Sequence, residues 1–406
     1  MIWLSIIGVD ETGLTGLTED QIKRLKAAKH IITADRWIED LHQMGIHDGV
    51  EIWPSPFRDI YKKLDQWRGE PCVILATGDP LWYGAGSSII SHFPIDEMTI
   101  EPAPSGFQMA ASRMGWPMAK VVTLTLHGRP IEMIRRAVAP GAKLLILADS
   151  AATPKQVADH LMEMGIGSAA MTAIAHIGGA SEKRVDGNAM SWAKQPPEIA
   201  DFHMLAVACP DHSIGFLSTL PGLPDDAYDH DGKLTKSDIR AITLARLQPV
   251  AGQLLWDLGC GSGAVGIEWI RAAAFAGAVG VDSRQDRLAV ATQNAKRLGV
   301  PEWQGICGEN ISVLDGLDDP DAVFIGGGLS ADLVDRVMAR LRPSGRLVVN
   351  AVTLESEAIL LAMRQAHGGR LVRIAVSHAE PVGPYHGWRS AMPVTQWVWT
   401  KETFRG

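Results

Sequence analysis

The sequence predicts an α/β protein of two domains, on three observations. The chain has 406 residues, more than one hydrophobic core usually supports. Short apolar runs that suit buried strands alternate with segments whose apolar residues recur at helical spacing. A break rich in proline, glycine and aspartate spans residues 209–233. We place the boundary near residues 215 to 222 and expect domains over 1–215 and 222–406, each built on mainly parallel sheets.

The predicted elements follow in order along both halves. Buried strands are expected over residues 4–7, 72–75, 144–147, 254–256, 322–325 and 347–349. Helical spacing follows in residues 157–164, 288–298 and 333–341. Strand and helix therefore alternate in each half.

Composition excludes several classes of protein. Hydrophobic residues make up 46% and charged residues 21%, so most of the chain should fold. Lys and Arg number 38 against 46 Asp and Glu, for a net charge of −8. The general electrostatic footprint of a nucleic-acid-binding protein is therefore missing, and any anionic partner must meet a local basic patch.

The cysteines and the N-terminal residues indicate in which cellular compartment the protein is expected. Cys72, Cys209, Cys260 and Cys307 lie far apart without a C-x-x-C pair, so neither a disulfide framework nor a cysteine-based metal site is predicted. The first ten residues lack a basic region, and no later apolar run reaches membrane-spanning length. We expect a cytoplasmic protein with no export signal, no membrane span and no bound metal.

A glycine-rich turn dominates the second half. Residues 256–263 read W-D-L-G-C-G-S-G, between the strand that they end and a helix predicted over 264–274. Glycine permits the tight turn and the close approach of a cofactor to main-chain N–H groups at the helix start. Asp282 ends the next strand, about 20 residues further on, where a carboxylate can accept both ribose hydroxyls.

The glycines alone fit either a dinucleotide or S-adenosylmethionine, and the wider order of motifs favours S-adenosylmethionine. Asp257 precedes the turn, Gly308-Glu309-Asn310 follows a third strand, and residues 321–328, D-A-V-F-I-G-G-G, form a fourth. A fifth strand begins after residues 341–345. This order resembles the class I S-adenosylmethionine-dependent methyltransferases, which implies a Rossmann-like fold.

A second motif lies upstream of the turn. Thr235 followed by Asp238 has the spacing of a capping box at a helix start, so helix capping alone is one interpretation. Residues 229–240, D-H-D-G-K-L-T-K-S-D-I-R, together with the glycine turn are similar to the decarboxylating methyltransferase domain of cobalamin biosynthesis. That resemblance implies a second interpretation, in which the threonine lies beside the cofactor.

The same resemblance assigns cofactor-binding roles position by position. It places Thr235 beside S-adenosylmethionine, Asp282 on the ribose and Asn310 on the adenine side. Asn310 stands where a small residue is more usual. The loop role falls on Gly259, Cys260, Gly261, Ser262 and Gly263.

Three short motifs occur one after another in the first half. Residues 77–84 read T-G-D-P-L-W-Y-G, residues 102–108 read P-A-P-S-G-F-Q, and the triplet H-G-R occupies 127–129. The G-D-P step alone would be a proline-containing β-turn. Together the motifs resemble the tetrapyrrole methylase family, a two-lobed α/β fold that binds S-adenosylmethionine between its lobes.

This resemblance implies cofactor contacts at two steps of the first half. They map to Gly78 with Asp79 and to Ser105 with Gly106. The chain departs from the family pattern at Asp10-Glu11, where many relatives have Gly-Pro, and at Gly106, where alanine is usual. These departures affect contacts more than fold.

The order of the two domains resembles, over nearly all 406 residues, the bifunctional decarboxylating methyltransferase family of cobalamin biosynthesis. It implies methyl transfer to the C5 bridging carbon of a precorrin by the first domain, and to C15 by the second. The resemblance also implies loss of carbon dioxide from the ring C acetate in the second domain. The implied partner is a polycarboxylate tetrapyrrole, with a preference for the metal-free ring, and a homo-oligomer is expected.

No catalytic residue is named, because the substrate carries the reactivity. Pyrrolic nitrogen can push electrons onto a bridging carbon, so the enzyme mainly supplies position and a dry site. His378 and His386 are acid–base candidates by location only, and Trp82 or Trp388 could lie against the ring. Cations that could hold the carboxylates, or simply lie on solvated surfaces, are Arg113, Lys120, Arg129, Arg135, Arg136 and Arg389.

Two other functions compete with this one. The first is a nucleic-acid methyltransferase with an N-terminal recognition module, which the charge of −8 opposes. Gly326-Gly327-Gly328 also stands where an N/D-P-P-Y/F motif would follow the fourth strand. The second is a non-catalytic cofactor sensor or an NAD-binding protein, which binding measurements with both ligands would identify.

Overall fold

A computed structural model describes residues 1–212 and 215–402, and it divides into two compact units. The first unit comprises Met1–Ile131 and Val138–Gly215, and the second Glu132–Ala137 and Phe216–Gly406. Residues 213–214, at the end of the first predicted domain, and residues 403–406, at the end of the second, lie outside the described residues.

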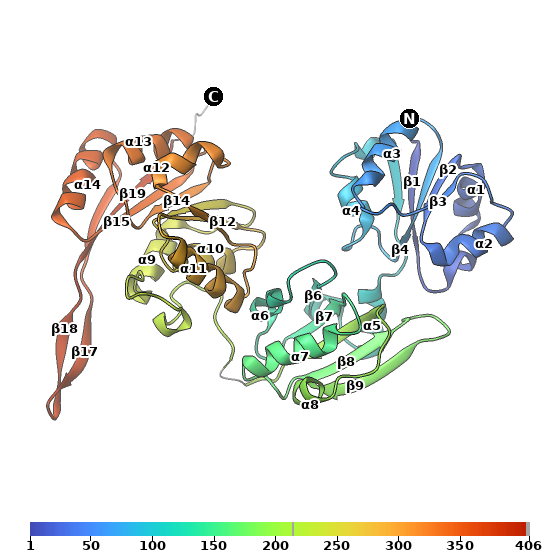
Figure 1. Cartoon of the computed structure of the whole chain (residues 1–406), viewed down its shortest axis with the longest axis horizontal. Coiled ribbons are helices and arrows are strands. Elements are labelled where there is room, and N and C mark those ends of the chain that lie inside the picture. Colours follow the sequence, from blue (N-terminus) through green and yellow to red (C-terminus); the bar gives the residue numbers. More distant parts are fainter. Residues whose placement is uncertain (213–214, 403–406) are drawn as a thin grey trace. The chain divides into compact units, whose positions relative to one another are not determined.

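The first unit begins with a five-stranded parallel sheet in the order β3-β2-β4-β1-β5 (Figure 1). Successive residues face opposite layers, so Ile6 packs toward α3 and α4 while Ile7 packs toward α1 and α2. The elements are β1 Leu4–Val9, α1 Glu19–Ala27, β2 His30–Thr33, α2 Ile38–Gln43, β3 Val50–Ile52, α3 Asp59–Trp67, β4 Cys72–Thr77, α4 Ala85–Ile89 and β5 Met98–Glu101.

A second five-stranded sheet, in the order β6-β7-β10-β8-β9, completes the first unit. Only β6 and β7 pair in parallel; the other three pairs are antiparallel. The elements are α5 Gly106–Met114, β6 Val121–Thr125, β7 Lys143–Leu147, α7 Thr153–Glu163, β8 Ala170–Ala175, β9 Lys183–Asn188, α8 Ala189–Lys194 and β10 His203–Ala208. Helix α6, Ile134–Ala137, falls in the short segment grouped with the second unit.

The prediction of a mainly parallel sheet is therefore wrong for this half of the first unit. The loop between β8 and β9 is too short for the crossover that parallel pairing requires, so the two strands form a hairpin. A hydrophobic run in the sequence indicates that a strand is buried, but it does not indicate whether the strand pairs in parallel or antiparallel.

The second unit holds a seven-stranded sheet in the order β13-β12-β11-β14-β15-β19-β16. Strands β11 to β15 are parallel, and β19 runs antiparallel to both of its neighbours. The strands are β11 Leu254–Leu258, β12 Gly277–Asp282, β13 Gln304–Cys307, β14 Ala322–Ile325, β15 Arg346–Ala351, β16 Arg370–Ile374 and β19 Val394–Thr400. The order reverses between β11 and β14, and open α/β sheets bind ligands at the carboxyl ends of the strands beside such a reversal.

Helices cover both faces of this sheet (Figure 1). Leu255 and Phe324 pack with α9 Ser237–Leu247, α10 Ala264–Ala272 and α11 Gln285–Arg297. Trp256 and Ile325 pack on the other face with α13 Ala331–Arg340 and α14 Leu354–His367, and the short helix α12 is Asn310–Val313.

A two-stranded hairpin, β17 Ser377–Val382 and β18 Tyr385–Ser390, extends away from the seven-stranded sheet (Figure 1). Its strands form a separate ladder, and Tyr385 and Trp388 are exposed on it.

In the described parts of the chain, no helix is both long enough and apolar enough to cross a lipid bilayer.

Candidate active sites

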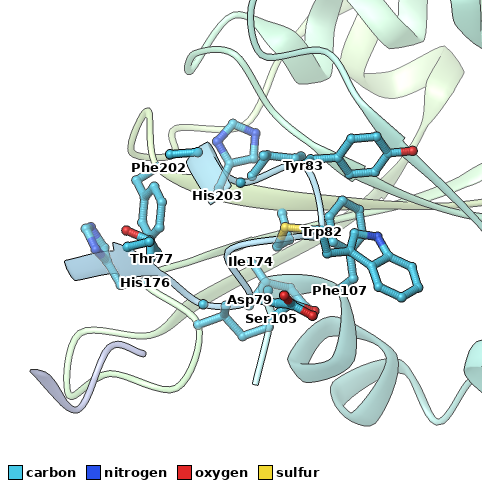
Figure 2. A pocket seen from close by; sticks show the side chains of 18 of the residues that line it. Thr77, Asp79, Trp82, Tyr83, Ser105, Phe107, Ile174, His176, Phe202 and His203 are labelled. Carbon is cyan, nitrogen blue, oxygen red and sulfur yellow. The ribbon is translucent and has the colours of Figure 1, made fainter. Parts of the chain in front are cut away.

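A cavity of about 270 Å³ lies in the first unit, where β4 ends and faces the second sheet. Figure 2 shows side chains that line this cavity, among them Asp79, Ser105, Trp82, Tyr83 and Phe107. All four residues that the tetrapyrrole methylase resemblance selected line this cavity: Gly78, Asp79, Ser105 and Gly106.

Gly78 is fixed by contacts with two neighbouring segments. Its amide donates to the Val9 carbonyl at 2.8 Å, and its carbonyl accepts from the Ala103 amide at 3.3 Å. Its φ of +65° favours glycine, and an added Cβ would lie 3.2 Å from the Cα of Ser105. The Asp79 carboxylate accepts the Leu81 amide at 2.8 Å, which closes the turn. The backbone of the turn at Gly78 and Asp79 therefore forms part of the cavity surface.

Ser105 is the N-cap of α5 in a full capping box. Its hydroxyl accepts the Gln108 amide at 3.3 Å, and its own amide donates to the Gln108 Oε1 at 2.8 Å. Gly106 follows as the first helical residue, and an added Cβ would lie 3.0 Å from the Met204 sulfur. The helix start is thus held against the cavity wall.

The rest of the lining includes residues that sequence analysis did not select, among them His176, Phe202 and His203. The Arg36 guanidinium donates to the Thr77 hydroxyl at 2.9 Å and lies 5.0 Å from the Phe202 ring. Glu11, at the departure from the family pattern, holds Arg36 at 3.0 Å. These residues come from distant segments with no shared spacing, so no sequence pattern indicates them.

An open hollow of about 480 Å³ adjoins this cavity and shares Trp82, Tyr83 and Gly84 with it. Arg129 and His127 of the H-G-R triplet line the hollow, and the Arg129 guanidinium lies 5.8 Å from the Tyr83 ring. Arg113, in contrast, makes two hydrogen bonds to Glu182, at 2.7 and 3.0 Å. Arg129 is therefore the better placed of the two to meet a carboxylate.

In the second unit, the glycine turn leads from β11 to α10. Gly259, Gly261 and Gly263 have φ values of +72°, +55° and +77°. The amides of Gly259 and Cys260 donate to the Val281 carbonyl, at 2.8 and 2.9 Å. A Cβ on Gly259 would lie 2.7 Å from the Gly327 nitrogen. Gly259 is needed here because a side chain would collide with the loop after β14, while the two amides hold the turn against β12.

Two buried carboxylates support the turn. Asp282 accepts the Gly261 amide and the Arg284 amide, both at 3.0 Å. Asp257 accepts the Gly266 amide at 2.9 Å, and its second oxygen has no partner among the described residues. Burial raises the pKa of Asp257 to about 7, and the charge of Asp282 adds to the shift.

The predicted residues of this unit do not share one hollow. Thr235 and Gly326 line a cavity of about 420 Å³. Gly261 and Ser262 line a smaller one of about 50 Å³. The other predicted residues line neither of these two: Gly259, Cys260, Gly263, Asp282 and Asn310. Asn310 donates instead to the Gly327 carbonyl at 3.0 Å.

The capping-box prediction at Thr235 is wrong. Helix α9 begins at Ser237, with Lys236 as its N-cap and no side-chain cap. The Asp225 carboxylate accepts the Ser237 amide at 2.9 Å, so a side chain from outside the motif satisfies the helix start. The carbonyl of Thr235 accepts from Arg240.

Arg240 organises the segment before α9. It is fully buried, and it donates to Glu268 at 2.6 Å and to the Leu223 carbonyl. Glu268 in turn accepts the Tyr228 hydroxyl at 2.9 Å. One buried ion pair therefore ties residues 223–235, including Thr235, to α10.

Metal ligation has no candidate in residues 1–212 and 215–402, where no three His, Cys, Asp or Glu side chains gather around one point.

Two family profiles match separate parts of the chain. The profile of the family described as tetrapyrrole (corrin/porphyrin) methylases matches residues 4–191, and that of the precorrin methyltransferase domain matches 226–401. A solved structure, the C-terminal domain of precorrin-6Y C5,15-methyltransferase from Rhodobacter capsulatus, is 44% identical. It covers 46% of this chain and 100% of its own, with a TM-score of 0.44.

Full-length relatives carry one name. A protein of Sinorhizobium sp called precorrin-6Y C(5,15)-methyltransferase [decarboxylating] is 37% identical over 403 residues, 98% of this chain and 96% of its own. The protein of that name from Mycobacterium tuberculosis (strain CDC 1551 / Oshkosh) is 34% identical over 400 residues, 98% of this chain and 99% of its own. The nucleic-acid alternative is not favoured by these matches. The chain belongs to the family of decarboxylating precorrin-6Y C5,15-methyltransferases.

Proposed function

We propose that this protein methylates C5 and C15 of precorrin-6B, also called precorrin-6Y, and decarboxylates the ring C acetate in cobalamin biosynthesis. S-adenosylmethionine is the proposed donor at both positions. The observation that carries the proposal is the end-to-end match, over 98% of the chain, to relatives of that name. We assign residues 1–215 to C5 methylation, and residues 222–406 to C15 methylation and decarboxylation.

The residues of the first unit fit a nucleoside with a charged sulfonium. Gly78 and Gly106 line the cavity with backbone alone, and Phe107 and Phe202 give it apolar walls. Asp79 supplies the cavity with a carboxylate. S-adenosylmethionine, when bound, supplies a methyl group that a nucleophilic carbon can take in line.

The second unit fits the same donor through different groups. Gly261 and Ser262 border one hollow and Thr235 another, at the carboxyl edge of the sheet where α/β proteins bind ligands. The amides of Gly259, Cys260 and Gly261 already have acceptors. We therefore infer that the turn shapes this site and that side chains around it contact the donor.

The chain's own part in methyl transfer is to hold the ring and exclude water. In the first unit, exposed Trp82 and Tyr83 stand between the cavity and the open hollow, where a flat ring could lie against them. Arg129 in the hollow can pair with a ring carboxylate. Placing the bridging carbon beside the methyl group accounts for much of such a rate enhancement, because orientation replaces a bimolecular encounter.

The test uses the full-length protein, the metal-free substrate and S-adenosylmethionine, with products read by mass spectrometry. We expect a product heavier by two methyl groups and lighter by one carbon dioxide. Gly106→Trp, which fills the first cavity, should leave only C15 methylation and decarboxylation. Thr235→Trp should leave only C5 methylation. Wild-type protein that consumes no donor with this substrate would overturn the proposal, and a parallel assay with the cobalt-containing ring tests the preference for the metal-free one.

A further inference from the structure

The cavity of about 420 Å³ in the second unit carries an inference that rests on the proposed function and deepens it. Gly326, which follows β14, and Asn350, near the end of β15, form its floor. The start of α9 forms one wall, and the base of the hairpin β17–β18 forms another, through His378 and Ala391. The cavity therefore lies beside the reversal point of the sheet, where Gly326 donates to the Leu258 carbonyl at 2.9 Å.

Ionisable groups from two separate elements meet across this cavity. The Nε2 of His378, on β17, lies 3.4 Å from the Oδ2 of Asp238, in the first turn of α9. Their side chains are 60% and 51% exposed, so both remain in reach of solvent. Asp238 thereby provides a counter-charge for a protonated imidazole. Across the hairpin from His378, the Arg389 guanidinium is held by Glu380 at 2.9 Å.

Two lysines stand on the same wall as Asp238. Lys236 pairs with Asp225 at 3.5 Å. Lys233 is exposed, and its ammonium makes no ion pair with any described residue. The rest of the lining is largely apolar, including Ile239 and Met392. The cavity thus presents a free cation, an apolar interior and an imidazole–carboxylate pair.

Loss of carbon dioxide from an acetate side chain needs these three features. The bond between the methylene carbon and the carboxylate carbon breaks, and its electron pair passes into the conjugated ring. Carbon dioxide leaves, and the methylene carbon must gain one proton to become a methyl group. A cation orients the carboxylate, an apolar site favours the loss of its charge, and an acid delivers the proton.

We propose that His378, paired with Asp238, is the catalytic acid that protonates this methylene carbon, and that Lys233 holds the carboxylate before it leaves. The imidazolium gives up its Nδ1 proton, because Nε2 faces Asp238, and becomes neutral. Because the side chain is 60% exposed, water can return a proton to it for the next turnover. Carbon dioxide is uncharged and no longer attracts Lys233, so it can depart.

The test compares His378→Gln with the wild type in the full-length protein. Carbon dioxide release and transfer of the second methyl group are counted on the same substrate sample, whose ring C carboxylate is isotopically labelled. We expect carbon dioxide released per C15 methyl to fall roughly hundredfold, since a positioned acid contributes about that factor, with methyl transfer nearly unchanged. The matched control is His386→Gln, on β18 of the same hairpin, which should keep the wild-type ratio.

Two further variants sharpen the test. Asp238→Asn should lower the same ratio less than His378→Gln, because it removes only the counter-charge. Lys233→Met should raise the KM for the substrate more than it changes the ratio. Thermal melting of each variant reports folding independently of activity.

Each outcome bears on the inference. A wild-type ratio in His378→Gln would overturn it, and so would parallel loss of methyl transfer and decarboxylation, because that pattern indicates a structural histidine. If the wild type itself neither transfers methyl groups nor releases carbon dioxide, the proposed function fails instead, so the two failures are distinguishable.

Discussion

The two units use glycine differently around their clefts. In the first unit, Gly78 and Gly106 both line the cavity, and an added Cβ on Gly106 would meet only the flexible side chain of Met204. In the second unit, Gly259 packs against the backbone of Gly327. A glycine can therefore line a cavity in one unit and support a turn from inside in the other.

Buried charge separates the units further. Among the described residues, the buried polar side chains of the first unit are hydroxyls and one histidine. The described part of the second unit buries five charged residues: Arg240, Asp257, Glu268, Arg271 and Asp282. Buried charges are costly unless they are paired and hydrogen-bonded. The second unit should thus respond strongly to pH and to the loss of a charge, and the first mainly to changes of shape.

The largest effect is expected for Arg240→Ala, because it leaves Glu268 buried without its partner. Removing one member of a buried pair costs about 3–5 kcal/mol, so the second unit should melt well below its wild-type temperature. Scanning calorimetry should show the transition of the first unit unmoved. The control Arg284→Ala removes an exposed partner of Asp286 and should leave both transitions in place. Equal shifts in the two variants would contradict the contrast between the units.

A comparison of Gly259→Ala with Gly106→Ala tests whether glycine supports a turn in the second unit and only lines a cavity in the first. At Gly259 the positive φ and the contact of 2.7 Å with Gly327 leave no room, so we expect a loss of about 2 kcal/mol and of donor binding in the second unit. At Gly106 the Met204 side chain can move aside, and stability should stay near the wild type. Calorimetric titration counts the sites that remain, one for Gly259→Ala and two for Gly106→Ala. The reverse order of damage would reject this interpretation of the two turns.

Much of the second unit is predictable from sequence because its motifs follow the order of its strands. The glycine turn, Asp282 and Asn310 come directly after β11, at the end of β12 and after β13, and parallel strands bring their carboxyl ends to one edge. The second sheet of the first unit is different, because buried runs such as residues 144–147 carry no information on strand direction. That these site residues hold S-adenosylmethionine stays a prediction.

The rest of each site depends on contacts between distant segments. His176 and Phe202 reach the first cavity from the loops beside β8 and β10, and Asp238 meets His378 from α9 and β17. No periodicity or spacing relates such residues. At Thr235 local pattern was misleading, because Arg240 and Asp225 supplied the tertiary partners that displaced a capping box.

Asp257→Asn tests the pH response of the second unit. With a pKa of about 7 against an ordinary 3.8, Asp257 holds its proton more tightly when the protein is folded. The proton on Asp257 therefore stabilises the folded state at low pH. This stabilisation is lost as pH rises from 3.8 to about 7, and it stays lost at higher pH. Asparagine cannot ionise, so the Tm of the variant relative to wild type should rise by a few degrees between about pH 5 and pH 8.

The control for this pH effect is Asp286→Asn. The hydrogen bond to Arg284 lowers the pKa of Asp286, so this carboxyl is ionised in both states throughout that range. Its Tm difference from the wild type should stay flat with pH. A flat profile for Asp257→Asn as well would show that the Asp257 carboxyl is not protonated near neutrality.

The smallest effect separates shape from stability in the first unit. Ser105 and Thr18 each close a capping box, on α5 and α1, so replacing either with alanine should cost about 1 kcal/mol. Only Ser105 lines the cavity. If the helix start at Ser105 and Gly106 shapes the donor site, Ser105→Ala should weaken donor binding in the first unit severalfold, while Thr18→Ala melts equally early and binds normally. The two variants lose the same kind of cap. Equal donor affinities in Ser105→Ala and Thr18→Ala would therefore mean that the start of α5 contributes only to stability, and that other residues lining the cavity bind the donor.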